Sequence, residues 1–396
     1  MRLFVVVAAL AASTSSALVA VSRSRALGLA PAARRFGASG APPRPLVARR
    51  GNVEMNAVLA GAGRLAVNYA LPVLGAAVGG WYLKKRLDRP SRPYDREANS
   101  VGREYDAWTR EGILEHYWGE HIHLGYYTDE ELKRGYLRKD FIEAKYNFTQ
   151  RMMDWGGVTD ARTADGGEDV KILDVGCGIG GTSRYMATTL PEAHVTGITL
   201  SGEQRDRAAR LAEERSIANA DFKVMDALAM DFPDDSFDVV WGCESGEHMP
   251  DKKKYVTEMA RVLKPGGKMV IATWCQRDNA TTSFTPEEEK ALDFLYSEWT
   301  HPYFISIPDY AKLLGDDAKM QDVATDDWNK NTIASWRHSI WVGVFDPWPV
   351  IKAGPRMWYK CLRDGICLER MHRAFDRGLM EYGMIKGTKP ASPSPA

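Results

Sequence analysis

Short apolar runs alternate with polar stretches of helical length through the middle of this 396-residue chain. The runs that predict buried strands are 170–175, 194–201, 222–225, 237–241 and 269–273. Continuous apolar runs of this length are typical of strands that are buried on both faces. Their alternation with helices therefore predicts an α/β fold of Rossmann-like type, with a mostly parallel sheet and helices on both of its faces.

The first of these strands leads into a helix through Gly176, Gly178 and Gly180. Glycines let the backbone approach a ligand closely at a helix N-terminus, where free N–H groups favour an anionic group. The spacing differs from the G-x-G-x-x-G turn of dinucleotide-binding folds, and Asp174 just before it would repel a pyrophosphate. An acid there suits a cofactor with an ammonium group and no phosphate, and S-adenosyl-L-methionine is such a cofactor.

Ligands of open α/β sheets bind at the carboxyl ends of the strands, so residues that follow the predicted strands are the candidates for a site. Asp226 and Ala227 follow the third strand, where a side chain can meet an adenine amino group. Glu244 and His248 follow the fourth strand, close to where a transferred methyl group should project. The positions after these strands therefore predict a methyltransferase site.

Three motifs in this core carry a family resemblance: Ile172–Gly181, Gly197–Ser201 and Glu244–Lys252. Two flanking blocks, Trp108–Tyr126 and Trp299–Ile307, extend it. Together they resemble the plastid and cyanobacterial prenylquinol methyltransferases of the tocopherol methyltransferase group, over residues from about 100 to 390. The resemblance implies a class I S-adenosylmethionine-dependent methyltransferase fold with a helical lid and cap.

The motifs divide over the ring substrate. The two flanking blocks look like the 2-methyl-6-phytyl-1,4-benzoquinol methyltransferases of tocopherol and plastoquinone biosynthesis. Residues 244–252 and 273–278 look more like γ-tocopherol methyltransferase. A more distant alternative is N-methylation of a small amine. C-methylation of a prenylated benzoquinol is the leading hypothesis, since the hydrophobic segment 65–83 and a tryptophan-rich C-terminal part argue against a small soluble substrate.

The cofactor-binding candidates follow from the strand ends and the resemblance. The turn glycines and Asp174 are expected to hold the methionine part of the cofactor. The second strand ends at Thr199 where many such enzymes have an acid, and the pattern resembles that of cyclopropane-fatty-acid synthases, which implies that Thr199, Leu200 and Gln204 hold the ribose. The full set of cofactor candidates is Asp174, Gly176, Gly178, Gly180, Thr199, Leu200, Gln204, Asp226 and Ala227.

The chemistry needs a base near the ring, because removing a phenolic proton pushes electron density onto the adjacent ring carbon. His248 is the first candidate, since its unperturbed pKa suits neutral pH, and Glu244 is expected to orient it or to contact the cofactor. His121 and His123 are interpreted as lid contacts to cofactor or substrate. No carboxylate or cysteine pattern accompanies them, so no metal site is predicted.

The N-terminal part differs in composition from the rest. Residues 1–53 contain eight arginines and no Asp, Glu or Lys, which leaves 44 of the 52 basic residues against 52 acidic ones. The mildly acidic remainder argues against nucleic-acid binding. An apolar run after Met1 followed by an Arg-rich, acid-free segment resembles the bipartite presequence of an alga whose plastid lies in the secretory route, which predicts a chloroplast protein.

Residues 65–83 form an uncharged run between Arg64 and the basic cluster 84–86, and a helix of that length spans roughly 28 Å. With Trp81 and Tyr82 beside the cluster, the run predicts membrane association, by a span or an interfacial helix. The expected organisation is a presequence (1–52), a membrane-anchor segment and linker (53–94), a helical lid (95–165), the methyltransferase core (166–278), a cap with the substrate-binding part (279–388) and a disordered tail (389–396). No obligate protein partner is inferred.

The C-terminal part contains tryptophans at 336, 341, 348 and 358 among apolar residues. They fit a tunnel for a prenyl tail, a membrane-facing surface, or the core of a small helical cap. The five cysteines show no zinc-like pairing, and those at 177, 243 and 275 are expected to be reduced core or pocket-wall residues.

Overall fold

The structure is a computed structural model that describes residues 71–159, 169–280 and 282–391, in two compact units, 1–88 and 89–396. The expected presequence lies outside the described residues, as does part of the run 65–83. In the first unit, helix α3 (Leu71–Leu87) exposes Val73, Leu74, Trp81 and Tyr82 and ends in the basic cluster Lys84, Lys85 and Arg86. None of the helices in the described ranges is both long and apolar enough to cross a bilayer.

The second unit is built on a seven-stranded sheet with the order β3-β2-β1-β4-β5-β7-β6. The strands are β1 (Val170–Val175), β2 (Ala193–Thr199), β3 (Ala220–Val224), β4 (Phe237–Cys243), β5 (Leu263–Gln276), β6 (Gln321–Asp327) and β7 (Met380–Thr388). The pairs among β1 to β5 are parallel, while β7 runs antiparallel to both β5 and β6. The expected α/β fold with a mostly parallel sheet is confirmed.

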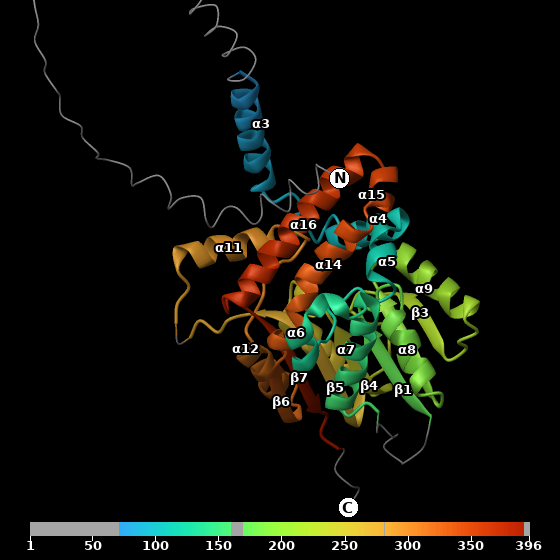
Figure 1. The fold of residues 1–396 in the computed structure, drawn as a ribbon. Helices are drawn as coiled ribbons and strands as arrows, with labels where there is room; N and C mark the ends of the chain where they lie inside the picture. The colour runs from blue at the N-terminus through green and yellow to red at the C-terminus, as the bar shows by residue number, and fades with distance from the viewer. Residues whose placement is uncertain (1–70, 160–168, 281, 392–396) are drawn as a thin grey trace, which may run out of the picture. The chain divides into compact units, whose positions relative to one another are not determined.

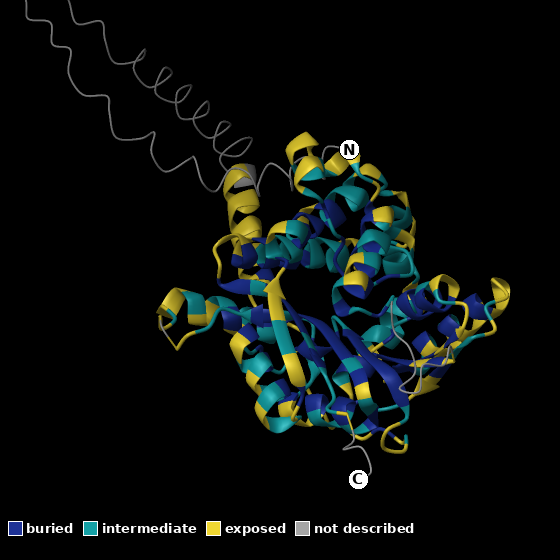
Figure 2. Cartoon of the chain, turned by 90° about the horizontal axis from the view of Figure 1, so that it is seen from below, coloured by how far each residue is buried: buried dark blue, intermediate teal, exposed yellow. Residues whose placement is uncertain are grey.

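Strands β6 and β7 lie in the segment that the sequence assigned to the cap, so the sheet continues beyond residue 278. The apolar-run criterion missed β6 because it is an edge strand with mostly exposed polar residues, and it missed β7 because two glycines, Gly383 and Gly387, interrupt it. In Figure 2 the central strands are dark blue while one strand is largely yellow, as expected for an exposed edge. The C-terminal segment thus contributes both to the core and to the cap.

Side chains of the central strands alternate between two hydrophobic cores, one on each face of the sheet. Val270 and Ala272 of β5 point into the first core, and Met269 and Ile271 into the second. The first core also takes residues of α7 (Phe141–Gly156), α8 (Gly181–Thr189), α11 (Pro286–Tyr296), α14 (Ala334–Phe345) and α16 (Pro355–Asp376). The second takes residues of α10 (Lys252–Val262) and α12 (Ile307–Lys312), and α9 (Gly202–Glu214) packs on β3.

The remaining helices are short, and several gather around α14 and α16 (Figure 1). They are α4 (Ser100–Glu111), α5 (Ile113–Trp118), α6 (Asp129–Arg134), α13 (Asn329–Thr332) and α15 (Trp348–Lys352), with the turns η2 (Tyr136–Arg138), η3 (Gly246–His248) and η4 (Leu313–Asp317). Helix α4 contacts α9 and α5, and Asp106 of α4 accepts a hydrogen bond from Ser201 Oγ just after β2. This contact holds α4 across the carboxyl ends of the strands.

A buried ion network fixes the segment before α4. Arg92, in the segment before α4, and Arg363 of α16 both pair with the carboxylate of Glu298, whose side chain is 1% exposed. Arg92 also pairs with Glu104 of α4 and Asp364 of α16. Because three acids share two buried guanidinium groups, the lid segment is tied to the cap helices and not only to the sheet.

Candidate active site

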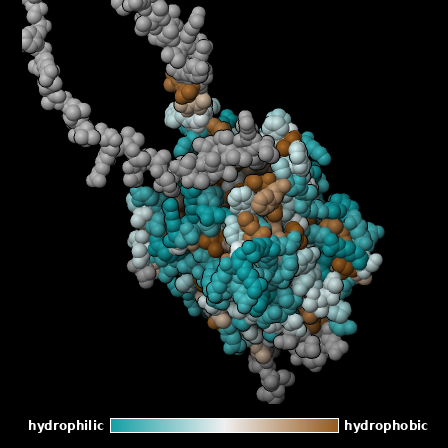
Figure 3. Space-filling model, viewed as in Figure 1, coloured by the Kyte–Doolittle hydropathy of each residue, from teal (hydrophilic) through white to brown (hydrophobic). Residues whose placement is uncertain are grey.

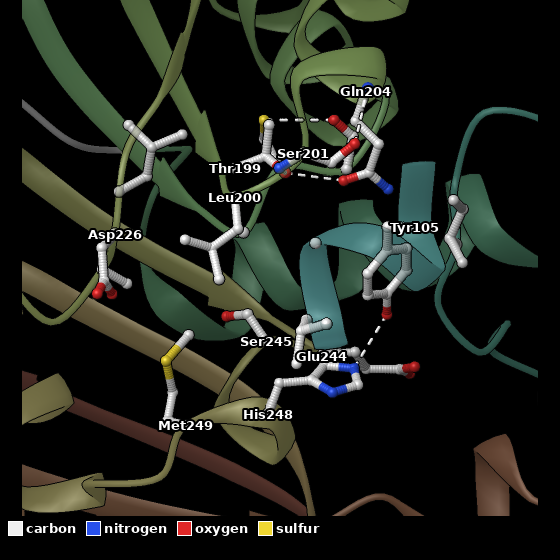
Figure 4. Close-up of a pocket in the computed structure, with 18 of the residues that line it drawn as sticks. Tyr105, Thr199, Leu200, Ser201, Gln204, Asp226, Glu244, Ser245, His248 and Met249 are labelled. Carbon is white, nitrogen blue, oxygen red and sulfur yellow. Dashed lines mark hydrogen bonds between the residues drawn. The ribbon is translucent and has the colours of Figure 1, made fainter. Parts of the chain in front are cut away.

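A cavity of about 260 Å³ opens at the carboxyl ends of β1, β2 and β4, under residues 94–105 (Figure 4). Its wall includes eight of the nine cofactor candidates, all except Gly180, and also Glu244 and His248. Residues far apart in the sequence, from Tyr94 to Pro250, therefore form one cavity at the edge of the sheet where ligands bind in such folds.

Two of the three turn glycines shape this cavity. All three have positive φ, 89° at Gly176, 56° at Gly178 and 76° at Gly180, which side-chain-bearing residues rarely adopt. A Cβ at Gly176 would lie 2.4 Å from Cβ of Ser245, whereas a Cβ at Gly178 would face open space with only the Gln204 amide at 3.8 Å. The backbone at Gly178 is therefore open to a ligand.

The structure places Gly180 differently from its two neighbours. A Cβ there would meet the Phe222 ring at 2.5 Å and the Arg184 guanidinium at 2.8 Å. Gly180 is the N-cap of α8 and does not line the cavity. Its positive φ thus serves the turn and the packing of β3 against α8.

The end of β2 forms a small polar network on the cavity wall. The Thr199 hydroxyl donates to Gln204 Oε1 over 2.8 Å, and Ser201 Oγ caps α9 by accepting from the Gln204 backbone N–H. Leu200 lies between them and is 37% exposed, which for a side chain that lines this cavity leaves apolar surface open toward it. Figure 4 shows Thr199, Leu200 and Gln204 side by side at this wall.

Asp226 makes two contacts at the end of the neighbouring strand, β3. Its Oδ1 accepts the backbone N–H of Leu228 and so caps a turn. Its Oδ2 lies 4.0 Å from Arg96 of the lid segment, and the residue lines the cavity with Ala227, Met225 and Met249. The cavity here has two thioether side chains beside a polar edge, a surface that suits a flat heterocycle.

Asp174 ends β1 in a buried position, 2% exposed, where it accepts a hydrogen bond of 2.6 Å from Ser183 Oγ. Burial raises its pKa to about 6, because the charged form loses solvation. An ammonium group beside this carboxylate would favour its charged form. Nearby, the ring Nε2 of His121 is buried without a hydrogen-bond partner among the described residues, although His121 lines the cavity. Such an atom is the kind that a ligand satisfies.

Glu244 has the most unusual setting at the site. It follows β4 with φ 47°, in the left-handed region where a non-glycine residue is strained, and such residues cluster at functional sites. Two donors reach the same oxygen, Oε1: the backbone N–H of Leu124 at 2.8 Å and the Tyr382 hydroxyl at 2.6 Å. Oε2 therefore has no donor among the described residues. Burial, and then the nearby carboxylate of Glu247, raise the pKa of Glu244 well above its ordinary value.

His248 is held by both of its ring nitrogens. Nε2 lies 3.0 Å from the Tyr105 hydroxyl, and Nδ1 lies 3.4 Å from the carbonyl oxygen of Thr300. A carbonyl only accepts, so Nδ1 carries the hydrogen and Nε2 accepts from Tyr105. Burial lowers the pKa of His248 to about 4, so the ring is neutral at physiological pH. Figure 4 shows Tyr105 from the lid meeting His248.

The sequence did not single out Tyr105, Ser245 or the segment 94–102, all of which line the cavity. No local motif marks Tyr105, because its approach depends on α4 folding over the strand ends. Of the tryptophans in the C-terminal part, Trp336 belongs to the hydrophobic core and is 1% exposed, while Trp348 and Trp358 are exposed. The cysteines are free as expected, and Cys177 and Cys243 form part of the cavity wall.

Residues 172–267 match the family model described as a methyltransferase domain. The chain is 41% identical to the 2-methyl-6-phytyl-1,4-hydroquinone methyltransferase of Synechocystis sp. over 74% of this chain and 89% of that protein. It is 36% identical to the chloroplastic tocopherol O-methyltransferase of Arabidopsis thaliana, over 70% of this chain and 79% of that protein. The chain belongs to the prenylquinol and tocopherol methyltransferase family.

Solved structures support the fold of this methyltransferase. Geranyl diphosphate C-methyltransferase of Streptomyces coelicolor A3(2), solved with S-adenosyl-L-homocysteine, aligns with a TM-score of 0.57 at 18% identity, over 76% of this chain and all of that one. The cofactor of the family is S-adenosyl-L-methionine, and the cavity fits it: the backbone is open at Gly178, His121 of the cavity wall has a buried ring nitrogen without a partner among the described residues, and the carboxylate of Asp174 ends β1 at the same wall.

Proposed function

We propose that this methyltransferase transfers a methyl group from S-adenosyl-L-methionine to a ring carbon of a prenylated benzoquinol of the 2-methyl-6-phytyl type, in tocopherol and plastoquinone biosynthesis. The single observation that carries the proposal is Glu244: a carboxylate on the cavity wall with one oxygen free and a raised pKa. A phenol requires such a base, and the identity to the cyanobacterial hydroquinone methyltransferase supports the ring substrate.

S-adenosyl-L-methionine, when bound, supplies an activated methyl group on a sulfonium. The chain's own part is to hold the cofactor, align the ring and manage protons. Asp174 and the backbone at Gly176 and Gly178 would hold the methionine part, Thr199, Leu200 and Gln204 the ribose, and Asp226 with Ala227 the adenine. These residues line one cavity, so a single ligand can reach all of them.

Glu244 is placed to take the phenolic proton at Oε2. Its raised pKa makes it a stronger base than an ordinary carboxylate once it is ionised. As the proton leaves the hydroxyl, the ring carbon beside it gains the electron density that forms the new C–C bond. Glu244 can then return that proton to the oxygen and, as the carboxylate again, take the hydrogen that the methylated ring carbon loses as a proton; release of this proton to solvent restores the starting state. The contacts of Oε1 to Leu124 and Tyr382 fix the carboxylate group of Glu244 in the cavity wall.

His248 acts with Tyr105. Nε2 of the neutral ring accepts a hydrogen bond from the Tyr105 hydroxyl and so fixes Tyr105 on the cavity wall. The hydroxyl oxygen of Tyr105 can then accept a hydrogen bond from the substrate. Replacing His248 by Ala is expected to lower kcat about tenfold, the effect of losing one hydrogen bond of about 1.4 kcal/mol, with little change in cofactor affinity. Single-turnover kinetics and calorimetry measure the two quantities. Tyr105→Phe should lower kcat similarly, and the double variant no further; additive losses would contradict a working pair.

The second candidate substrate is γ-tocopherol, supported by the identity to the Arabidopsis thaliana enzyme. Its chromanol carries the same kind of phenolic hydroxyl, so the same base serves both. The deciding assay offers the purified chain labelled S-adenosyl-L-methionine with phytyl-benzoquinol, solanesyl-benzoquinol, γ-tocopherol and sarcosine. Faster methylation of a benzoquinol than of γ-tocopherol supports the proposal. Methylation of sarcosine alone would replace it with the small-amine alternative.

We also propose that the enzyme works in the plastid, at a membrane, where a prenylated substrate resides. The acid-free N-terminal segment and the chloroplastic relatives in Arabidopsis thaliana and Oryza sativa subsp. japonica support the plastid. Fusing residues 1–94 to a fluorescent protein in an alga with such a plastid tests this, because plastid fluorescence is expected and secretion into the medium would contradict it.

A further inference from the structure

Three large aromatic side chains stand in solvent where α14, α15 and α16 meet. Phe345 is 68% exposed, Trp348 62% and Trp358 42%. Among the described residues of the second unit, no other large hydrophobic side chain is as exposed as the first two, Val224 being next at 50%. We call Phe345, Trp348 and Trp358, with Lys352 and Arg356 between them, the aromatic tip. In Figure 3, apolar colour gathers over the region of α14 and α15.

Contacts within the unit fix the aromatic side chains of the aromatic tip. Phe345 stacks on Trp341 with ring centroids 5.5 Å apart. Trp358 donates from Nε1 to the carbonyl oxygen of Ile351 over 3.2 Å and so ties α16 to α15. Val350 between them is buried and anchors α15 to the unit. Exposed aromatics held in this way present apolar area without having to be ordered first.

The charges of the aromatic tip are positive. Lys352 and Arg356 are exposed and make no ion pair within the part of the chain that the structure describes. The nearby Asp346 is already engaged by His116 of α5, and Lys360 pairs with Glu111. Two free cations beside exposed tryptophans leave a surface that is both apolar and basic.

We infer that the aromatic tip docks on the surface of a bilayer that contains anionic lipid. Tryptophan is enriched at membrane–water interfaces, where an apolar ring and a polar edge are both satisfied, and lysine and arginine are drawn to anionic headgroups. Docking of a second copy of the chain through the same surface would bury the rings, but it would place the two cations of one copy against the same two cations of the other. Helix α3 of the first unit, described by itself, shows the same combination of exposed aromatics and a basic cluster.

This inference rests on the proposed function for the biological role of docking, and not for the binding to the bilayer. Helix α5 contacts Asp346, the residue after Phe345 of the aromatic tip, since the Tyr117 hydroxyl donates to the carbonyl oxygen of Asp346 and His116 reaches its carboxylate. A small hollow between α4 and α5 is lined by Trp108 and Leu114 among others. It shares Tyr105, Ile122 and Ile179 with the main cavity. Docking would therefore bring the helices that border the cavity to the membrane, where a prenylated ring is dissolved.

The test is oxidative footprinting of side chains in the full-length chain. Vesicles of phosphatidylcholine mixed with phosphatidylglycerol are expected to protect Phe345, Trp348 and Trp358 from oxidation, and vesicles of phosphatidylcholine alone much less. Tyr303, which is 36% exposed on the same unit, serves as the reference. Because the readout is resolved by residue, binding of vesicles through α3 does not mask it.

Two variants sharpen the test. Lys352→Gln with Arg356→Gln should raise the lipid concentration for half protection about 30-fold, since each cation near an anionic surface contributes about fivefold. Phe345→Ala with Trp348→Ala should weaken binding similarly, as read from the protection of Trp358. The matched control is Arg210→Gln with Val224→Ala, an exposed cation and an exposed apolar residue on α9 and β3, which should change nothing.

Three outcomes would overturn the inference: protection that is confined to residues 71–87, an equal effect of the control pair, or protection that appears with protein concentration without vesicles, which indicates a second copy. Vesicle binding needs no methyl transfer. The vesicle test can therefore fail while the proposed activity is observed, and the proposed activity can fail while the vesicles still bind. Unchanged cofactor affinity by calorimetry shows that each variant is folded.

Discussion

Replacing Glu244 by Gln is expected to lower kcat about 100- to 10,000-fold, the range of a lost general base. The amide keeps the size of the side chain and still accepts from Leu124 and Tyr382, but it cannot take a proton. Cofactor affinity, measured by calorimetry, should stay within a few-fold. A full retention of kcat in Glu244→Gln would remove this residue as the base and return that role to His248.

The same residue predicts a pH dependence. The proton acceptor is the carboxylate, and its raised pKa means that the carboxylate form becomes dominant only as the pH rises through the neutral to alkaline range. kcat/KM in the native enzyme should therefore rise with pH there, and not level off near pH 5 as for an ordinary glutamate. Glu247→Gln should move this limb to lower pH, because it removes a neighbouring carboxylate that helps raise the pKa.

Replacing Gly178 by Val is expected to abolish measurable cofactor binding, a loss of at least about 100-fold or 2.7 kcal/mol. The valine side chain would enter the open space at the glycine turn, which we assign to the methionine part of the cofactor. Equilibrium dialysis with labelled S-adenosyl-L-methionine measures the loss. Retained affinity would contradict the assignment of this cavity to the cofactor.

Backbone strain must be separated from steric exclusion, because Gly178 has φ 56° and a β-branched residue is strained there. Gly266 offers the matched control: its φ is 77°, it is exposed, and a Cβ there would meet nothing within 4 Å. Gly266→Val should lower the melting temperature by a comparable amount while leaving cofactor affinity unchanged. Equal loss of affinity in both variants would mean that strain, and not the occupied space, is responsible.

Much of the cavity wall that we assign to the cofactor could be predicted from the sequence, because its residues follow strand ends directly. Thr199 and Gln204 are five positions apart on a strand end and the first turn of α9, so local geometry alone brings them together. Gly180 shows the limit of this reasoning. It belongs to the same motif as Gly176 and Gly178, but it lies further along the turn, where a Cβ would meet the ring of Phe222 and would not enter the cavity.

The acceptor side could not be predicted in the same way, because its properties come from burial and from distant partners. The ordinary pKa of His248 made it the first candidate for the base, yet burial lowers that pKa, and Tyr105, 143 residues earlier, occupies Nε2. Glu244 owes its raised pKa to burial and to Glu247, and its orientation to Leu124 and to Tyr382 on β7. None of these neighbours is marked by a local pattern.

The sequence by itself determined the parallel core of the sheet, the glycine turn and the family, since apolar runs, strand-end residues and short motifs are local and survive without knowledge of the fold. Tertiary structure alone decided that β7 enters the sheet between β5 and β6, that α4 lies over the strand ends, and which carboxyl groups have a raised pKa. The physical reason is that the solvation of a side chain and its long-range contacts depend on which residues folding brings near it. The pKa of a buried group therefore reflects all of its spatial neighbours and not its position in the sequence.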